Sequence, residues 1–347
     1  MKLNSLSKEK ISWLEQNQSD GIIISTRIRL ARNLEDYFFP QRISSKEKEE
    51  ILKKVKNIIL HNNVIPNAKI FSLNELDEID MVFLVERHLI SYEHAKKEKG
   101  RGLIVSKDET SSIMVNEEDH LRLQEIQSGL SLSLAWERIS KIENYLEKHL
   151  NFAFSQKLGY LTACPTNVGT GIRVSLLIHL PGLVWKQEIN KVLEALNRLG
   201  IVARGFYGEG TKVIGDIFQL SNQVTLGRKE EEIIDSLKKV IKQVVEQEIK
   251  AEDYLYTQRK DKIIDIVSRA LGTLKYAYKI SFAEAMDMFS YIRLGIYLKV
   301  ITGIKLSTLN ELMVNIQPAH LQERVGERLT SSQRDVVRAR FIREQLN

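Results

Sequence analysis

Charged residues gather in one short stretch, N-E-E-D-H-L-R, at residues 116–122. Such a stretch can simply start a helix. Asn116 is a good N-cap, Asp119 stands where a capping box places an acceptor, and the two glutamates between them would complement the positive end of the helix dipole. Apolar residues then recur at spacings near three or four as far as Leu146, which predicts one helix with an apolar face. Taken alone, the stretch is interpreted as a helix start.

Arginines recur in segments that have weaker structural explanations. In S-T-R-I-R-L, Arg27 and Arg29 stand two residues apart in a predicted strand, so both side chains point to one face. Two like charges side by side repel unless an anion lies between them. Each segment taken singly could still be a solvated basic surface. Five arginines are candidates for binding an anion: Arg27, Arg29, Arg122, Arg173 and Arg204.

Two glycine-containing loops carry further candidates. The first, C-P-T-N-V-G-T-G-I-R, begins at Cys164, and the second, R-G-F-Y-G-E-G-T-K, contains Glu209. Glycines let backbone N–H groups approach a ligand closely, but no G-x-x-x-x-G-K-[ST] occurs, so neither is a Walker A loop. Cys164 is either a small buried hydrophobe or, beside arginines, a thiolate with a lowered pKa. The second loop could simply be a mobile surface loop.

Together these side chains favour a site for a triphosphate. Arginine offers planar, permanently charged donors that match phosphate oxygens, so five of them predict a triphosphate held without a Walker loop. The same set contains the cysteine and three acids: Glu117, Glu118 and Glu209. This is the chemistry of phosphoryl transfer by positioning and charge neutralisation.

Short predicted strands alternate with longer helices from about residue 21 to 250. Strands are expected at 22–30, 81–85, 102–106, 112–115, 174–180, 201–205 and 215–220, and helices at 45–59 and from about 228. The third and fourth of these strands form a hairpin. Hairpins beside helices predict an α+β fold with a largely antiparallel sheet flanked by helices.

Strand signals end after about residue 255. A helical segment at 263–272 is followed by capping boxes at Ser281 and Thr308 and by a basic helix from 329. Because 347 residues exceed the usual size of one core, two domains are expected. We predict a first domain at 1–255 and an all-helical second domain at 256–347.

Composition restricts the class of protein. The chain is 43% hydrophobic and 28% charged, with no apolar run of about 18 residues and no leader at Met1, which predicts a cytoplasmic globular protein without membrane contact. A single cysteine excludes an internal disulfide. The excess of 51 basic over 45 acidic residues is modest, and no nucleic-acid-binding signature accompanies it. The apolar faces of the helical domain predict a homo-oligomer.

Four motifs, in this order, closely resemble the ATP:guanidino phosphotransferases, the family that contains creatine and arginine kinases: S-T-R-I-R, N-E-E-D-H-L-R, C-P-T-N-V-G-T-G-I-R and R-G-F-Y-G-E. The resemblance covers roughly residues 20–250. Within the family the sequence is most similar to the bacterial protein-arginine kinases, and there the similarity extends through the helical region. Phosphagen kinases carry a helical domain on the order of 100 residues before S-T-R-x-R, but barely two dozen residues stand there in this chain. An acceptor pocket open to protein surfaces is therefore expected.

The resemblance implies a role for each candidate. The five arginines would hold the phosphates of Mg-ATP, Glu118 and Glu209 would hold the substrate guanidinium with Glu117 beside them, and Cys164 would contact a guanidinium nitrogen. No residue is expected to bind a metal directly. Leu177 stands where phosphagen kinases place a histidine against the adenine, and His88 is the alternative candidate for a nucleotide contact.

A physical argument agrees with these roles. A guanidinium is a poor nucleophile because its proton is held with a pKa above about 12 and its lone pair is delocalised. Two carboxylates can orient it and accept the departing proton. On the predicted helix, Glu118 would face the acceptor while Arg122, one turn later, faces the donor phosphates.

The C-terminal R-D-V-V-R-A resembles the phosphoarginine-binding segment of the protein-arginine kinases. Arg334 and Arg338 are one helical turn apart with Asp335 between them, a geometry that can chelate a phosphoryl group. The alternative is that these basic residues only complement the C-terminal end of a helix.

These observations predict a protein-arginine kinase that transfers the γ-phosphoryl group of Mg-ATP to arginine side chains. The alternatives are a kinase for a small guanidino compound and a non-catalytic adaptor that reads phosphoarginine. The resemblance further implies a role in the stress response and protein degradation, with a heat-shock repressor and proteins destined for a Clp protease as substrates. It also implies the zinc-binding activator McsA as a partner.

Overall fold

The computed structural model describes residues 3, 6, 10–15, 21–206 and 213–346. The chain forms two compact units that are interleaved in sequence. Unit 1 contains Met1–Trp13, Ser25–Ser175 and Ser221–Leu237, and unit 2 contains Leu14–Ile24, Leu176–Leu220 and Lys238–Asn347.

An eight-stranded sheet organises the first two thirds of the chain, in the order β2-β3-β4-β5-β1-β8-β10-β9. Its strands are β1 (Ile23–Arg32), β2 (Lys69–Ser72), β3 (Gly102–Val105), β4 (Ser111–Val115), β5 (Leu121–Ser128), β8 (Ile172–His179), β9 (Ile201–Arg204) and β10 (Ile217–Asn222). β5 pairs antiparallel with both β4 and β1, and β3 pairs antiparallel with both β2 and β4. A separate hairpin joins β6 (Phe154–Ser155) to β7 (Gly159–Tyr160). The prediction of an α+β fold with a largely antiparallel sheet is confirmed.

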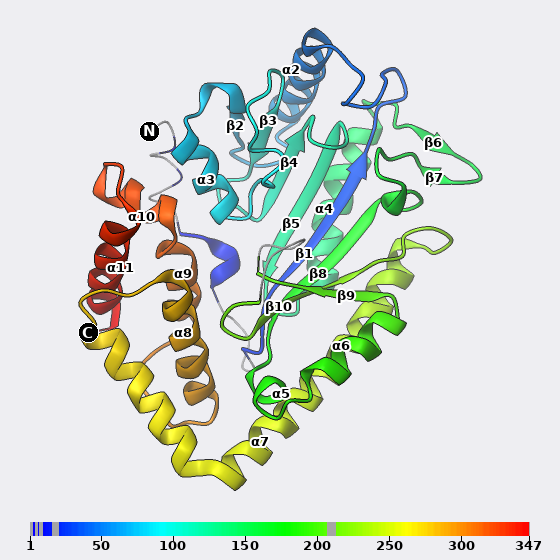
Figure 1. Cartoon of the computed structure of the whole chain (residues 1–347). Coiled ribbons are helices and arrows are strands. Elements are labelled where there is room, and N and C mark those ends of the chain that lie inside the picture. Colours follow the sequence, from blue (N-terminus) through cyan, green and yellow to red (C-terminus); the bar gives the residue numbers. More distant parts are fainter. Residues whose placement is uncertain (1–2, 4–5, 7–9, 16–20, 207–212, 347) are drawn as a thin grey trace. The chain divides into compact units, whose positions relative to one another are not determined.

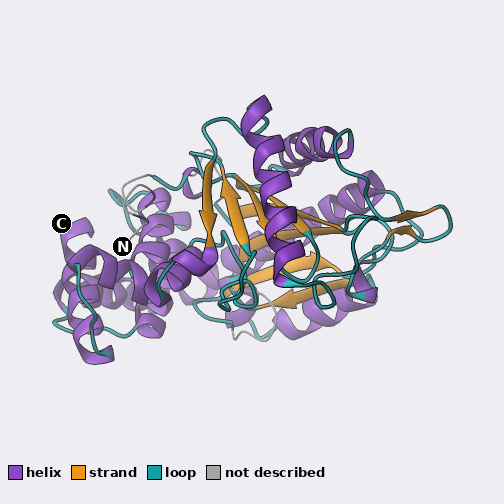
Figure 2. Cartoon of the chain, turned by 90° about the horizontal axis from the view of Figure 1, so that it is seen from above, coloured by secondary structure: helices purple, strands orange, loops and turns teal. Residues whose placement is uncertain are grey.

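Among its described residues, unit 1 contains α2 (Ser45–Asn62), α3 (Glu78–Glu86), α4 (Leu132–Glu147) and the start of α7 (Glu230–Tyr276) as far as Leu237. α2 begins where predicted, because Ser44 and Glu47 form a complete capping box. α4 packs against β5 and buries an apolar stripe that includes Ala135, Ile139 and Leu146. Figure 1 shows α4 lying along the sheet, and Figure 2 shows the strands with helices packed on them. Short 3₁₀ turns occur at Ser12–Leu14, Leu73–Glu75 and Pro165–Asn167.

Helices dominate unit 2: α5 (Pro181–Trp185), α6 (Ile189–Arg198), the part of α7 (Glu230–Tyr276) that follows residue 237, α8 (Phe282–Tyr297), α9 (Leu306–Asn315), α10 (Pro318–Val325) and α11 (Ser331–Leu346). α7 is kinked at Arg259, which has non-helical angles. The helices share a core that includes Phe289, Leu312 and Phe341. The predicted helical C-terminal region is confirmed, and Ser281 caps α8 as expected, whereas α9 begins before Thr308.

Residues 81–85 form part of α3, so the prediction of a strand there was wrong. Asp77 begins a capping box with Asp80: each side chain accepts a hydrogen bond from the backbone N–H of the other residue. The apolar run is buried except at Val82, which is 38% exposed. A short apolar run fits a buried strand and a buried helix equally well, and the D-E-I-D capping signal decides for the helix.

Residues 116–120 form the turn of the β4–β5 hairpin, so the helix predicted from Asn116 was wrong. Asn116 adopts a left-handed φ of 59°, and its N–H donates to the carbonyl oxygen of His120 at 2.8 Å, which closes the hairpin. The helix begins only at Leu132, after Gly129 at φ 60°. For a few residues after the turn, the apolar positions fit both the spacing of a helix and the alternation of a strand. Because β5 pairs with a strand on each edge, the strand forms.

Two buried carboxyl groups fix the start of α5 to α7 within unit 2. Glu248 accepts hydrogen bonds from the N–H groups of Gly182 and Leu183. Glu252 lies one turn further along α7 and shares a hydrogen bond with Glu248. Burial and the neighbouring Glu248 charge raise the pKa of Glu252, so this carboxyl group stays protonated and donates to Glu248. Gly182 has no alternative, because a Cβ there would lie 2.8 Å from a Glu248 oxygen.

We predict that this pair makes the folded state less stable as the pH rises. A carboxyl group whose folded pKa is raised stabilises the fold below its ordinary pKa of 4.5, and this contribution is lost as the pH rises through the folded value. Glu252→Gln keeps a donor without an ionisable proton, so it should raise the unfolding free energy by about 1–3 kcal/mol at mildly alkaline pH and flatten the pH dependence. Urea unfolding at several pH values measures this; a pH slope equal to that of the unsubstituted protein would contradict it.

Candidate active site

Four of the candidate arginines lie on one face of three neighbouring strands. Arg27 and Arg29 are on β1, and both side chains are half-buried. In the β1–β5 pairing, Ala31 is opposite Arg122, which puts Arg122 on the same face as the two β1 arginines. Arg173 is on β8, the other neighbour of β1, and its guanidinium donates to the Ser221 hydroxyl at 3.2 Å.

The two β1 arginines of this face lie among like charges. Burial, together with the charges of Arg122 and Arg173, lowers the pKa of Arg27 to about 9. Burial, then the charges of Arg27, Arg122 and Arg173, lower the pKa of Arg29 well below its ordinary value. Among the described residues neither β1 arginine forms an ion pair, and the buried Nε of Arg29 has no hydrogen-bond partner there. Such a face needs an anionic ligand with several oxygens, and a polyphosphate fits this requirement.

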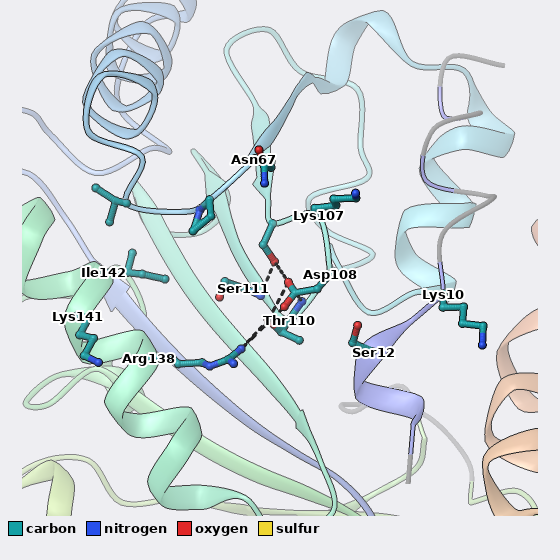
Figure 3. A pocket seen from close by; sticks show the side chains of 13 residues that line it. Lys10, Ser12, Asn67, Lys107, Asp108, Thr110, Ser111, Arg138, Lys141 and Ile142 are labelled. Carbon is teal, nitrogen blue, oxygen red and sulfur yellow. Dashed lines mark hydrogen bonds and ion pairs between the residues drawn. The ribbon is translucent and has the colours of Figure 1, made fainter. Parts of the chain in front are cut away.

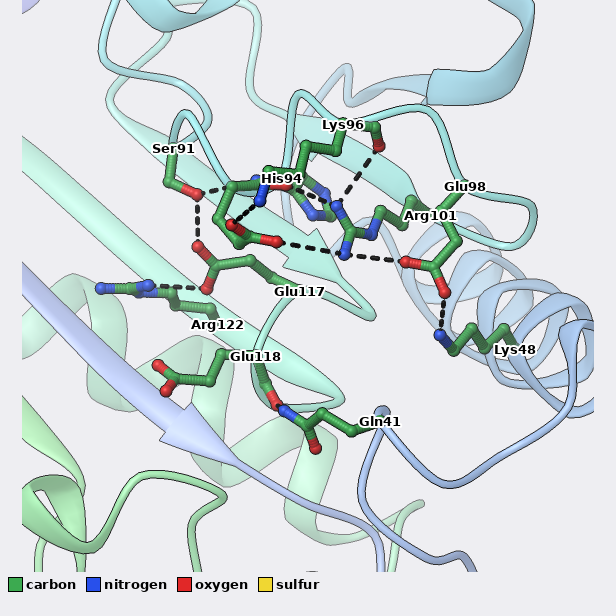
Figure 4. Close-up of polar contacts among 11 residues, drawn as sticks. Gln41, Lys48, Ser91, His94, Lys96, Glu98, Arg101, Glu117, Glu118 and Arg122 are labelled. Carbon is green, nitrogen blue, oxygen red and sulfur yellow. Dashed lines mark hydrogen bonds and ion pairs between the residues drawn. The ribbon is translucent and has the colours of Figure 1, made fainter.

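Glu117 is the exception, because it neutralises Arg122. It is 5% exposed, and its carboxylate accepts hydrogen bonds from Arg122 Nη1 at 2.6 Å and from the Ser91 hydroxyl (Figure 4). Burial alone would raise the pKa of Glu117, but the Arg122 charge and these hydrogen bonds lower it to about 2. Glu117 is therefore ionised and oriented toward Arg122.

Glu118 occupies the next position in the hairpin turn. Its side chain is half-buried, and in Figure 4 its carboxylate lies apart from that of Glu117 and from Ser91. The backbone oxygen of Glu118 accepts a hydrogen bond from Gln41 Nε2 at 2.9 Å. The predicted spacing of one helical turn between Glu118 and Arg122 was wrong, since a tight turn and the start of β5 separate them.

Asp119 connects this turn to the cysteine loop, a role that the sequence did not suggest. Its Oδ1 accepts hydrogen bonds from the Ala163 N–H at 2.7 Å and from Asn33 Nδ2 at 2.6 Å. Asn33 in turn accepts from the His120 N–H at 2.9 Å. Interpretation as a helix cap concealed this role. The available signal was an asparagine, Asn33, directly after the arginine-containing stretch S-T-R-I-R-L-A-R.

Cys164 directly follows Ala163, whose N–H donates to Asp119. It is half-buried, and its Sγ is 3.0 Å from the Thr166 hydroxyl. The loop then returns to the sheet at Gly171, which has a φ of 61°. A Cβ at Gly171 would lie 2.7 Å from the Ala31 carbonyl oxygen, so only glycine permits this close contact with β1. Asp119 thus brings Glu118 and Cys164 into one neighbourhood beside the arginine face.

His88 lies close enough to the arginine face for the charges of Arg27 and Arg29 to lower its pKa. Burial, then the charges of Arg27 and Arg29, lower the pKa of His88 to about 3, so its ring is neutral. The ring also meets Trp13 edge to face, with centroids 5.6 Å apart. Leu177 is 6% exposed and belongs to the apolar core of unit 2.

The remaining candidates are outside unit 1. Arg204 is the last residue of β9 and is half-buried in unit 2. Glu209 lies outside the described residues. Arg338 is 2% exposed and donates to the carbonyl oxygens of Ile316 and Ile280 and, at 2.5 Å, to Asp335. These contacts tie α11 to the residues that flank α8 and α9, in accord with a structural role for Arg338.

A separate cavity of about 900 Å³ opens in unit 1, between the β3–β4 turn and α4. Figure 3 shows Arg138 pointing toward Asp108 and Thr110, while Lys10, Lys107 and Lys141 do not converge on it. The described residues contain no group of three or more His, Cys, Asp and Glu side chains suited to a metal ion. None of the helices built from described residues combines the length and apolar character needed to cross a membrane.

Comparison with known proteins agrees with this geometry. The family model of the ATP:guanido phosphotransferase C-terminal catalytic domain matches residues 50–251. In fold, the chain is similar to the duplicated taurocyamine kinase from Schistosoma mansoni with bound transition state analog components. The TM-score is 0.62 at 23% identity, over 78% of this chain and 42% of that longer one. By fold and by family, the chain is an ATP:guanidino phosphotransferase.

Curated relatives and a second family model narrow the assignment. The model of the protein-arginine kinase McsB C-terminal domain matches residues 260–347. The protein-arginine kinase of Halothermothrix orenii is 46% identical over the full length of both chains. That of Pelotomaculum thermopropionicum is 45% identical over 96% of this chain and 95% of its own. The chain belongs to the protein-arginine kinase family.

We predict that the arginine face lowers the stability of the ligand-free protein. Arg27→Gln removes one of the mutually repelling charges, so it should raise the unfolding free energy by about 1 kcal/mol while reducing the extra stability that ATP confers. Thermal unfolding with and without ATP measures both effects. Arg198→Gln, at an exposed position on α6, is the control and should change neither. Lower stability of Arg27→Gln without ligand would refute the idea of repulsion.

Proposed function

We propose that this chain is a protein-arginine kinase that transfers the γ-phosphoryl group of Mg-ATP to arginine side chains of proteins. The observation that carries the proposal is the juxtaposition of two β1 arginines that form no ion pair with described residues and a hairpin turn that carries a second carboxylate, that of Glu118. The first part suits a polyanionic donor and the second suits a cationic acceptor. Family membership supports both assignments.

The nucleotide phosphates would bind to Arg27, Arg29, Arg122 and Arg173, with Arg204 as a fifth contact and His88 beside the nucleotide. Glu117 holds the Arg122 guanidinium in place. Mg²⁺ would arrive with the phosphates, because phosphate oxygens are its usual ligands at such sites. Its charge would neutralise the triphosphate further during transfer.

The acceptor guanidinium would bind to Glu118 and Glu209, with the Cys164 sulfur as a further contact. In the transfer step, a guanidinium nitrogen forms a bond to the γ-phosphorus while the bond to the β,γ-bridging oxygen breaks and ADP leaves. The proton of that nitrogen passes to a carboxylate, for which Glu118 is our candidate. The arginine face stabilises the charge on the departing phosphate oxygens.

Family membership extends the proposal to the cell. We assign residues 1–255 to the catalytic domain and residues 256–347 to a helical domain, in line with the two family models. A cytoplasmic, homo-oligomeric enzyme of the stress response would phosphorylate a heat-shock repressor and mark proteins for a Clp protease, with McsA as activator.

We expect Glu118→Gln to reduce phosphoryl transfer by roughly 10²–10⁴-fold, because the neutral amide cannot accept the proton or orient the guanidinium. Glutamine has nearly the same size as the half-buried Glu118 side chain, so thermal stability should change little. The assay is incubation with ATP and an arginine-rich protein, followed by mass spectrometry before and after acid treatment, since a P–N bond is acid-labile. Undiminished phosphoarginine in the variant's products would reject this role.

The same assay distinguishes the alternative of a small-molecule kinase. Free arginine offered with ATP should be a poor acceptor compared with a protein, because the relatives that match this chain along its length are named protein-arginine kinases. Equal kcat/KM for free arginine and for arginine in a protein would favour the alternative.

We also propose that Arg334 and Asp335 bind phosphoarginine, with Arg338 holding their helix. Arg334 is half-exposed, whereas Arg338 is buried among backbone carbonyls. Calorimetry with a phosphoarginine peptide should therefore show at least a tenfold loss of affinity for Arg334→Ala in a normally folded protein. Arg338→Ala should instead cost about 3 kcal/mol of stability. Unchanged affinity in Arg334→Ala would leave only the structural role.

A further inference from the structure

Two highly exposed aromatic side chains lie on segments that are hydrogen-bonded to the turn at residues 116–120, which is called the catalytic turn below. Phe38 is 73% exposed and Tyr92 is 60% exposed. Phe38 lies three residues before Gln41, which donates to the Glu118 backbone, and Tyr92 directly follows Ser91, which donates to the Glu117 carboxylate. Figure 4 shows Gln41 and Ser91 on either side of the two glutamates.

The segment that carries Phe38 is fixed to the turn along its length. Before Phe38, Asn33 donates to Asp119 at 2.6 Å, and the Tyr37 ring meets the His120 ring edge to face at 6.0 Å. After Phe38, Gln41 completes the attachment. The exposed phenyl ring therefore projects from backbone that is already ordered.

The segment that carries Tyr92 is equally constrained. The His94 N–H donates to the Ser91 hydroxyl at 3.0 Å, and the His94 ring is hydrogen-bonded to the Gly102 carbonyl at 3.0 Å. His94 is fully buried, so the short turn around Tyr92 is anchored in the core. An exposed aromatic side chain on rigid backbone loses little entropy when it binds a partner, which is typical of interface hot spots.

Both rings are within reach of a polypeptide whose arginine lies at Glu118. Three residues of extended chain separate Phe38 from Gln41 by at most about 11 Å, and adjacent residues such as Ser91 and Tyr92 are about 3.8 Å apart at their Cα atoms. A peptide of a few residues on each side of the acceptor spans such distances.

The charged residues near Phe38 indicate which kind of partner could bind beside the two exposed rings. The segment from 33 to 41 also exposes the carboxylates of Glu35 and Asp36, and it contains no basic residue. Aromatic faces attract guanidinium and ammonium groups as well as apolar side chains, and carboxylates attract the same cations. Beside Phe38 the surface therefore complements the basic residues of an arginine-containing polypeptide, whereas Tyr92, with Lys96, Lys97 and Lys99 exposed on its segment, contributes its aromatic ring alone.

We infer that Phe38 and Tyr92 form a docking surface for the polypeptide that flanks the acceptor arginine, with Glu35 and Asp36 attracting its basic residues. The inference rests on the proposed function, since it takes Glu118 as the acceptor site. It makes these two rings determinants of specificity for protein substrates, and they take no part in the transfer itself.

The test measures docking separately from catalysis. Reduced and alkylated lysozyme, an unfolded arginine-containing chain, is labelled with a dye, and its Kd for the kinase is measured by fluorescence anisotropy without ATP. Phe38→Ala and Tyr92→Ala should each raise this Kd about fivefold, and the double variant should raise it further. Tyr278→Ala, which removes a 76% exposed ring in unit 2, is the matched control and should leave the Kd unchanged.

Turnover supplies the second readout. With ATP, the two ring variants should show a raised KM for the lysozyme chain, while kcat and the KM for ATP stay at the level of the unsubstituted protein. Unchanged Kd and KM in both variants would overturn the inference. Absence of phosphoarginine from the unsubstituted protein, with docking still lost in the variants, would instead reject the proposed reaction and retain the surface.

Discussion

The site depends on a repulsion that the fold maintains. Arg27 and Arg29 stand on β1 with Arg122 and Arg173 on its two neighbouring strands. Among the described residues neither β1 arginine forms an ion pair, whereas Arg122 pairs with Glu117. Strand pairing and the apolar core beneath it hold these charges together at a cost in stability. An anion with several oxygens removes that cost. The arginine side chains that would bind a triphosphate are therefore already positioned before the ligand arrives.

The hairpin turn at residues 116–120 places its consecutive acids in different surroundings. Glu117 is buried and faces Arg122, which sets the position of a donor-side guanidinium. Glu118 is half-buried, and its carboxylate lies apart from this pair. The Asp119 carboxylate accepts hydrogen bonds from the Ala163 N–H and the Asn33 amide, and the first of these fixes the cysteine loop. Glu117 and Asp119 thus have different partners, a guanidinium for the first and backbone and amide donors for the second.

Sequence patterns predicted most of this fold because the deciding signals were local. The helix at 45–59 and the hairpin between 102 and 115 need only neighbouring residues, and both appeared as expected. The helix predicted from Asn116 failed because tertiary pairing of β5 on both edges overrode an ambiguous apolar spacing. The roles of Ser91 and Asn33 could not be predicted, since each depends on contacts with residues 26 and 86 positions away. Residue types specified the chemistry, while long-range pairing specified which acid serves which cation.

A protein acceptor changes what must provide specificity. A small guanidino compound can be enclosed, so its whole surface contributes to recognition, whereas an arginine within a protein presents one side chain and leaves its flanking chain outside any pocket. Recognition of that flanking chain requires exposed side chains near the acceptor, and their backbone must be ordered if they are to add affinity instead of losing entropy. The segments around Phe38 and Tyr92 meet both conditions because the hydrogen bonds that order them are made to the catalytic turn itself. Substrate docking and catalytic geometry therefore rest on the same contacts, and a substrate that displaces either segment also moves Glu117 or Glu118.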